Sequence, residues 1–294
     1  MRKKLGYLIK LFRIKQWVKN AFIFFPLLFS GNLFQPIPLF KCAVTFVGFC
    51  LIASSVYILN DFLDRKKDRL HPKKSDRPLA QNRINPSLVT LLILVTMALG
   101  LWVTLTVDPL IMYTAIFYIV VHLVYNFYTK NVVILDVIFV AIGFQVRVWA
   151  GSFAAGVMPS VWLQLCVFLL ALFLGFTKRR HEIATLKDQA AEHRMVLAHY
   201  TTYLLDQIII ICSTLAIVFY GLYTISTDMG GKEIHHNMIY SIGFVIYGMF
   251  RYLYLVHVRK LGDDPGEVMF SDKPLMINII LWIGYSITIL YFSI

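Results

Sequence analysis

The strongest constraint in this sequence is a series of apolar segments, each about as long as a membrane is thick. A helix needs about 20 mostly apolar residues to cross the hydrocarbon layer. Nine segments of the chain have this character, with cores at residues 18–34, 38–60, 86–107, 109–127, 132–150, 160–177, 203–226, 237–257 and 274–293. Only 15% of the 294 residues are charged, against about 25% in an ordinary globular domain. The sequence therefore predicts an all-α, polytopic membrane protein with nine transmembrane helices.

The segments follow one another without a domain-sized linker, so we expect residues 1–294 to form a single transmembrane domain. The first segment departs most from a regular span, because Lys19, Asn20 and Pro26 interrupt it. A proline inside a helix removes a backbone hydrogen bond and disturbs the preceding turn. The helical structure of this segment is therefore the least secure of the nine.

Basic residues predict how the chain is oriented in the membrane. The net charge is +12, and 24 of the 28 lysines and arginines lie in the N-terminal tail or in every second loop. Such an asymmetry is typical of cytoplasmic loops in a membrane protein, and it argues against nucleic acid as the partner. We expect a multi-pass protein of the bacterial inner (cytoplasmic) membrane, with the N-terminus in the cytoplasm and the C-terminus outside.

An acidic motif follows the second apolar segment on its predicted cytoplasmic side. It reads NDFLDRKKD, and it contains Asn60, Asp61, Asp64 and Asp68. At about 100° per residue, positions 60, 64 and 68 fall within roughly 80° of one another on a helix, with position 61 beside them. Carboxylate and amide oxygens suit Mg²⁺ that is shared with substrate phosphates. The motif predicts a Mg²⁺ site that faces the cytoplasm and takes a phosphorylated substrate.

Basic residues come directly after this motif, in the sequence HPKKSDRP at 71–78. Lys74 and Arg77 are candidates for binding phosphate there. Diphosphate chemistry needs acidic groups for a metal and basic groups that neutralise the leaving group. The alternative is an ordinary solvated cytoplasmic loop, which would explain the basic residues but not the shared face of the carboxylates.

Two arginines lie inside apolar segments, and a charged cluster ends the sixth segment. An arginine at the centre of a span costs at least about 2.5 kcal/mol, so Arg147 and Arg251 indicate either function or a structural ion pair with another helix. Asp136 lies about three turns from Arg147, too far for a pair within that helix. The cluster KRRHE at 178–182 brings Lys178 and Glu182 to one helix face, although a plain charged helix end would look the same.

Together these residues resemble the UbiA superfamily of intramembrane prenyltransferases, which share a nine-helix bundle and an NDxxDxxxD motif that binds Mg²⁺ and diphosphate. Members that act on aromatic acceptors usually have a second aspartate-rich motif at the end of the sixth helix, where this chain has KRRHE. That departure is similar to the decaprenyl-phosphate phosphoribosyltransferase branch. Matching stretches lie at 16–20, 56–61, 71–78, 147–151, 178–182, 251–252 and 264–273.

The resemblance implies transfer of 5-phosphoribose from phosphoribosyl pyrophosphate (PRPP) to a polyprenyl phosphate of the decaprenyl type, in the synthesis of cell-envelope glycolipid precursors. A lipid phosphate is already an anion and needs no general base, but its charge and that of the donor must be offset. The surplus of lysine and arginine around one acidic motif agrees with two anionic substrates.

The roles that this reading assigns are as follows. Asp61, Asp64 and Asp68, with Asn60, would bind Mg²⁺ and act in catalysis. The candidates for the donor's phosphates are Lys74, Arg77, Lys178 and Arg179. The candidates for the lipid phosphate or the 5-phosphate are Lys19, Lys130 and Arg147. Glu182 and Asp272 would bind a second metal or the ribose hydroxyls.

Two other functions are consistent with parts of the pattern. A UbiA-type polyprenyltransferase would instead use a polyprenyl diphosphate donor and an aromatic or other small acceptor. A secondary transporter would also place arginines inside the membrane, but it usually has paired, broken spans, which this sequence lacks. The expected partners are PRPP, a polyprenyl phosphate and the lipid bilayer. The sequence is also compatible with a homo-oligomer.

Overall fold

The secondary structure of the chain is helical throughout the part that the computed structural model describes, residues 2–69, 75–82, 84–186, 195–226, 236–262 and 265–292. The α-helices are α1 (Arg2–Phe12), α2 (Phe24–Phe29), α3 (Pro36–Asp68), α4 (Pro86–Leu105), α5 (Pro109–Phe127), α6 (Leu135–Ala155), α7 (Val161–Leu186), α9 (Thr202–Ile225), α10 (Ile242–His257), α11 (Pro265–Ser271) and α12 (Lys273–Phe292). The 3-10 helices are η1 (Ile14–Ile23), η2 (Thr129–Asn131), η4 (Met195–His199) and η5 (His236–Ser241). The expectation of an all-α fold is confirmed for this part of the chain.

Eight helices among the described residues are long and apolar enough to cross a membrane. They correspond to the second through ninth predicted segments, and most of their ends agree with the prediction within a few residues. These helices make the protein an integral membrane protein. The predicted number of nine is not confirmed, because the first segment, at 18–34, does not form one long α-helix.

The first predicted segment is instead divided between η1 and α2. Arg13 precedes η1 in the left-handed conformation (φ 50°), and Gly31 follows α2 with φ 74°. Pro26 lies in the first turn of α2, where its missing N–H leaves no helical hydrogen bond unmade. A 3-10 helix rises about 2.0 Å per residue, so η1 and α2 together extend roughly 30 Å. The segment therefore has about the length of a short span although it is not a regular α-helix.

Asparagine and aspartate residues that precede prolines set the beginnings of two spans. Asn85 caps α4 by accepting a hydrogen bond from Ser87 N (3.0 Å), and Asp108 caps α5 by accepting one from Leu110 N (2.8 Å). In both helices the next residue is proline, which suits the first helical position because its missing N–H would have no partner there. These local signals explain why the predicted and observed starts agree.

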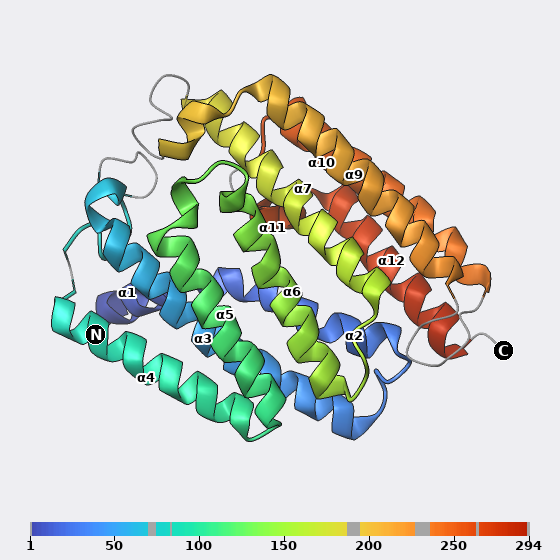
Figure 1. Ribbon diagram of the computed structural model, residues 1–294, viewed down its shortest axis with the longest axis horizontal. Coiled ribbons are helices and arrows are strands. Elements are labelled where there is room, and N and C mark those ends of the chain that lie inside the picture. Colours follow the sequence, from blue (N-terminus) through green and yellow to red (C-terminus); the bar gives the residue numbers. More distant parts are fainter. Residues whose placement is uncertain are drawn as a thin grey trace.

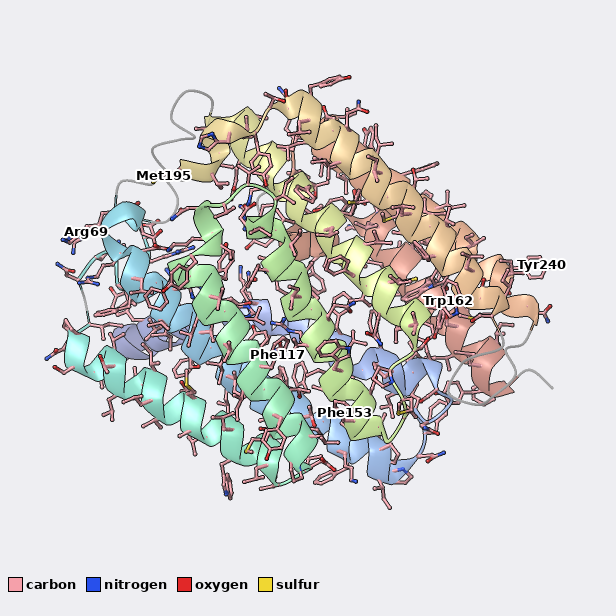
Figure 2. All side chains as sticks on the ribbon, in the orientation of Figure 1. Arg69, Phe117, Phe153, Trp162, Met195 and Tyr240 are labelled. Carbon is pink, nitrogen blue, oxygen red and sulfur yellow. The ribbon has the colours of Figure 1, made fainter. Side chains whose placement is uncertain are left out.

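The helices form one bundle with α6 near its centre (Figure 1). Helix α6 contacts α3, α5 and α7, and the segment η1–α2 packs between α6 and α3. Helices α4 and α9 lie at opposite sides of the view, and both present exposed apolar side chains, among them Trp102 on α4 and Ile211 on α9. Figure 2 shows side chains filling the spaces between the ribbons and projecting from the outer helices. The apolar outer faces are those that a bilayer would cover.

Close packing of η1 against α6 depends on Gly151. A Cβ atom at this position would lie 2.1 Å from the carbonyl oxygen of Ile23, far inside contact distance. The Cys42 thiol also reaches the Gly151 carbonyl oxygen at 3.8 Å. Any larger residue at 151 must push η1 away from the bundle.

We expect Gly151→Ala to lower the free energy of unfolding by about 3 kcal/mol, because the added methyl group meets backbone atoms that cannot rotate away. Thermal melting or unfolding in detergent would measure the change. Gly243→Ala is the matched control, since a Cβ atom there meets nothing within 4 Å and alanine favours a helix by up to about 1 kcal/mol. Equal effects of the two substitutions would contradict the prediction.

Candidate active site

The three aspartates of the acidic motif lie on the last turns of α3, which continues through the whole motif and ends at Asp68. Their helical spacing gives the three residues neighbouring positions on the helix surface, but the side chains of Asp61 and Asp64 point to different partners. The side chains of Asp61 and Asp68 are 6% and 8% exposed, whereas that of Asp64 is 25% exposed. Carboxylates that are so deeply buried must be paired with cations or metal ions.

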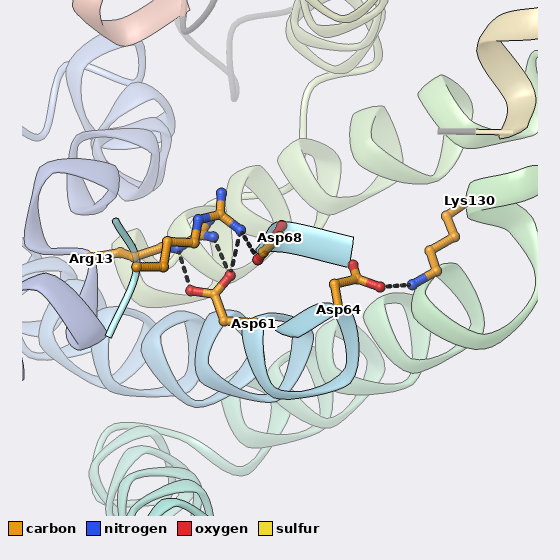
Figure 3. Close-up of polar contacts among 6 residues, drawn as sticks. Arg13, Asp61, Asp64, Asp68 and Lys130 are labelled. Carbon is orange, nitrogen blue, oxygen red and sulfur yellow. Dashed lines mark hydrogen bonds and ion pairs between the residues drawn. The ribbon is translucent and has the colours of Figure 1, made fainter. Parts of the chain in front are cut away.

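Two arginines from different parts of the chain bind Asp61 (Figure 3). Arg13 contacts both carboxylate oxygens, with Nε 3.0 Å from Oδ2 and NH2 close to Oδ1. Arg77 NH1 lies 2.8 Å from Asp61 Oδ1 and also 2.8 Å from Asp68 Oδ2. One nitrogen atom therefore occupies the position between two carboxylates where a shared cation would sit.

The third carboxylate points elsewhere. Asp64 Oδ1 accepts a hydrogen bond from Lys130 Nζ at 2.8 Å, and Lys130 belongs to η2 between α5 and α6. Figure 3 shows Asp64 directed toward Lys130, on the opposite side from Arg13. The carboxylates of the motif therefore form ion pairs with Arg13, Arg77 and Lys130, which come from three other segments of the chain.

The acidic motif has suitable ligands for Mg²⁺, but their arrangement is that of ion pairs. The described part of the chain contains no group of three or more His, Cys, Asp or Glu side chains arranged to hold a metal ion. Carboxylate oxygens nevertheless match the preference of magnesium, and Asp61 and Asp68 already converge on one cationic nitrogen. Asp61 and Asp68 could therefore bind a divalent cation if the Arg77 side chain moved out of the position between them.

Arg147 lies at the centre of the bundle and is only 3% exposed. Its guanidinium donates hydrogen bonds to Asn20 Oδ1 (2.7 Å), the Gly143 carbonyl oxygen (2.7 Å) and the Tyr118 hydroxyl (2.8 Å). It also lies over the Tyr118 ring, 4.7 Å from the ring centroid. These partners are all neutral, and they come from η1, α5 and α6. The contacts support a role for Arg147 in holding η1 in the bundle, beside the phosphate binding that the sequence suggests.

We expect Arg147→Lys to lower stability by about 2 kcal/mol, because one ammonium group cannot replace a planar fork that serves three separate acceptors. If Arg147 also binds a substrate phosphate, kcat/KM of the folded fraction will fall tenfold or more. Melting and turnover should be measured on one preparation. A loss of stability with unchanged specific activity would remove Arg147 from the phosphate site, and no change in either would contradict both roles.

Arg179 takes part in a second buried cluster, at the ends of α6 and α7. Its Nε donates to Asp136 Oδ2 (2.7 Å) and its NH1 to Glu182 Oε2 (2.6 Å). Asp136 is fully buried and also accepts a hydrogen bond from the Tyr200 hydroxyl (2.8 Å), which accepts one from Ile134 N (2.6 Å). Burial raises the pKa of Tyr200. The cluster joins α6, α7 and the segment before α9.

Arg251 pairs with a carboxylate near the start of the last helix. Its Nε and NH2 donate to Asp272 Oδ1 (3.1 Å) and Oδ2 (2.8 Å), and Asp272 Oδ1 also accepts from Leu275 N (2.9 Å). The Arg251 guanidinium lowers the pKa of the Asp272 carboxyl below its ordinary value. Arg251 thus forms an ion pair with a carboxylate from another segment, which is the structural alternative to a functional role for this arginine.

The predicted site residues are therefore divided among several places. Arg77 lies in the acidic cluster and Lys130 at its edge, whereas Arg179 and Glu182 form the cluster at the end of α7. Asn60 on α3, Lys19 on η1 and Lys178 on α7 are half-buried. Lys74 lies outside the described residues. The roles assigned to these residues stay predictions.

No sequence pattern predicted Arg13 as a site residue, or Asp136 and Tyr200 as partners of Arg179. Arg13 is one of several basic residues in the N-terminal segment, 48 positions before Asp61. Its left-handed backbone leaves no trace in the residue type, since arginine rarely adopts positive φ. The one available signal for Asp136 was a carboxylate early in an apolar segment, which requires a cation from another helix.

The sequence is similar to those of known membrane transferases. The model of the UbiA prenyltransferase family matches residues 22–271. The decaprenyl-phosphate phosphoribosyltransferase of Mycolicibacterium smegmatis is 31% identical over 97% of this chain and 93% of that protein. The protein of the same name from Corynebacterium glutamicum is 30% identical over 94% of this chain and 84% of that protein.

A solved structure has a similar fold. It is a UbiA homolog from Archaeoglobus fulgidus bound to DMAPP and Mg²⁺, with a TM-score of 0.74, 17% sequence identity, and coverage of 96% of this chain and 98% of that chain. At this identity the likeness concerns the fold. The family match covers most of the sequence, and the relatives match it nearly from end to end. The chain therefore belongs to the UbiA prenyltransferase family and is a membrane-embedded transferase.

Proposed function

We propose that the protein transfers 5-phosphoribose from PRPP to a polyprenyl phosphate of the decaprenyl type, releases pyrophosphate, and depends on Mg²⁺. The observation that carries this proposal is the cluster at the end of α3, where three carboxylates contact arginine and lysine side chains from other segments. Acidic groups beside basic groups suit a diphosphate leaving group with its metal. The names of the relatives supply the identity of the sugar donor and the lipid acceptor.

In this proposal Asp61, Asp64 and Asp68 hold Mg²⁺, with Asn60 next to them on α3. When bound, the ion would neutralise the diphosphate as it leaves C1 of the ribose. Arg77, which contacts Asp61 and Asp68 in the free protein, would leave these carboxylates to the ion and donate to phosphate oxygens. Lys74, Lys178 and Arg179 are the further candidates for the donor's phosphates. No group has to remove a proton from the acceptor, because a lipid phosphate is already an anion.

Lys19, Lys130 and Arg147 are proposed to bind the lipid phosphate or the 5-phosphate. Lys130 already bonds Asp64 (2.8 Å), so it lies at the edge of the acidic cluster. Glu182 and Asp272 are proposed to bind a second metal or the ribose hydroxyls, and both now accept hydrogen bonds from arginines. We place the reaction at the cytoplasmic face of a bacterial inner membrane, because the motif lies at the start of one of the lysine- and arginine-rich segments that are typical of the cytoplasmic side. We further propose that the product serves the synthesis of cell-envelope precursors.

Mass spectrometry of the lipid product tests the proposal. Purified protein in nanodiscs would be incubated with PRPP, decaprenyl phosphate and Mg²⁺, and the expected product is the lipid phosphate with one added phosphoribosyl group. Omission of Mg²⁺ or of PRPP should abolish the product. Turnover restricted to a prenyl diphosphate with an aromatic acceptor would contradict the proposal and favour a prenyltransferase.

A further inference from the structure

The carboxylate of Asp61 binds two guanidinium groups, which together saturate its Oδ1 oxygen. Its Oδ1 accepts from both Arg13 NH2 and Arg77 NH1, and its Oδ2 accepts from Arg13 Nε. A carboxylate oxygen has about two lone-pair sites, so Oδ1 has none left for another ligand. A metal ion can bind that oxygen only after one of the arginines moves away.

The position of Arg13 allows its side chain to change partner while its backbone stays in place. The preceding carbonyl, Phe12 O, accepts a hydrogen bond from Ser54 Oγ (2.9 Å), and Trp17 Nε1 donates to the same Ser54 hydroxyl (2.9 Å). These contacts fix the junction of α1 and η1 on α3. The Arg13 side chain itself is 21% exposed, and its guanidinium lies 5.4 Å from the Tyr57 ring centroid. It can therefore turn toward a ligand over Asp61 without any movement of α1.

The charges at this place oppose the binding of a metal ion alone. Within the described residues, Asp61, Asp64 and Asp68 contact three cationic side chains, Arg13, Arg77 and Lys130. Their formal charges cancel, so a lone divalent ion would add two uncompensated positive charges to a largely buried cluster. A divalent ion that enters with a diphosphate brings the anion that the displaced guanidinium groups need.

We propose that Arg13 is a diphosphate-binding residue that exchanges partners: it pairs with Asp61 in the free protein and donates to the diphosphate when a divalent cation takes the Asp61 carboxylate. The inference rests on the proposed function, because it assumes a metal-bound diphosphate in this site. Its consequence is that cation and diphosphate bind together, since each relieves the charge that the other creates. Arg13 then has two opposite effects, because it competes with the cation and attracts the diphosphate.

Isothermal titration of the full chain in nanodiscs tests this exchange with two probes, MgCl2 alone and inorganic pyrophosphate at a fixed Mg²⁺ concentration. Arg13→Gln should bind MgCl2 at least threefold more tightly than wild type, because one of the two guanidinium groups that compete with the cation for Asp61 is removed. The same variant should bind pyrophosphate at least tenfold more weakly. Arg13→Lys, which keeps the charge but not the fork, should fall between wild type and Arg13→Gln for both probes. Weakening of both probes, or an unchanged MgCl2 affinity, would overturn the proposal.

Arg259→Gln is the matched control, because Arg259 is an exposed arginine beyond α10 whose Nε contacts the Tyr254 hydroxyl (3.3 Å). It should leave both affinities unchanged. A shift equal to that of Arg13→Gln would mean that net charge, rather than the contact with Asp61, sets the affinities, and would also overturn the exchange. Lipid-product formation from PRPP is scored separately. Opposite affinity shifts without product would refute the phosphoribosyl transfer but not the exchange, and product with parallel shifts would refute only the exchange.

Discussion

Asp64→Asn is expected to reduce phosphoribose transfer at least about 100-fold while the protein still folds. Asp64 is proposed as a metal ligand, and metal stabilisation of a leaving phosphate contributes several kcal/mol, of which each 1.36 kcal/mol is a factor of ten in rate. Its side chain is 25% exposed and bonds Lys130. The substitution keeps the size of the side chain, so the cost to stability should be about 1 kcal/mol or less. Product formation and melting temperature should be measured on the same preparation.

Asp76→Asn is the matched control for this prediction. Asp76 is exposed in the segment that follows the motif, and its Oδ1 lies 3.5 Å from Gln81 Nε2. The control removes one carboxylate charge near the same end of the bundle without touching the cluster on α3. It should keep wild-type turnover. A wild-type rate in Asp64→Asn at modest Mg²⁺, or an equal loss in Asp76→Asn, would exclude a specific role for Asp64.

Asp136→Ala is expected to lower the free energy of unfolding by about 3 kcal/mol or more. Asp136 is fully buried and binds Arg179 and the Tyr200 hydroxyl. Its removal leaves Arg179 with Glu182 as its remaining acidic partner among the described contacts, and removal of one member of a buried ion pair typically costs about 3–5 kcal/mol. Because the pair joins α6 to α7, we expect the whole bundle to melt earlier. Unfolding in detergent, followed by circular dichroism, measures the change.

The control for Asp136→Ala is Asp206→Ala. Asp206 also pairs with an arginine of α7, Arg180, and it accepts from His257 (3.2 Å), but its side chain is 32% exposed. An ion pair that is accessible to water contributes about 1 kcal/mol or less. The two substitutions therefore remove the same kind of group at different burial. Equal losses of stability would contradict the assignment of Asp136 to a buried structural pair.

Local sequence determined most of the helical fold. Eight apolar segments became spans because their length matches the membrane thickness, and residue pairs such as Asn85–Pro86 and Asp108–Pro109 set where helices begin. The acidic motif could also be predicted, since the spacing of Asp61, Asp64 and Asp68 needs only helix geometry. Each of these inferences depends on residues within a few turns of one another.

Tertiary structure decided the rest, because the deciding partners are far apart in the chain. The segment η1–α2 follows from a left-handed residue at Arg13 and from close packing at Gly151, and apolar periodicity reports neither. Arg13 reaches Asp61 across 48 positions, Lys130 reaches Asp64 across 66, and Arg179 reaches Asp136 across 43. A charged residue in a buried position requires a partner of opposite charge or a hydrogen-bonding partner. Which residue supplies that partner depends on how the helices pack, and a sequence pattern with a period of 3.6 residues contains no information about contacts between helices.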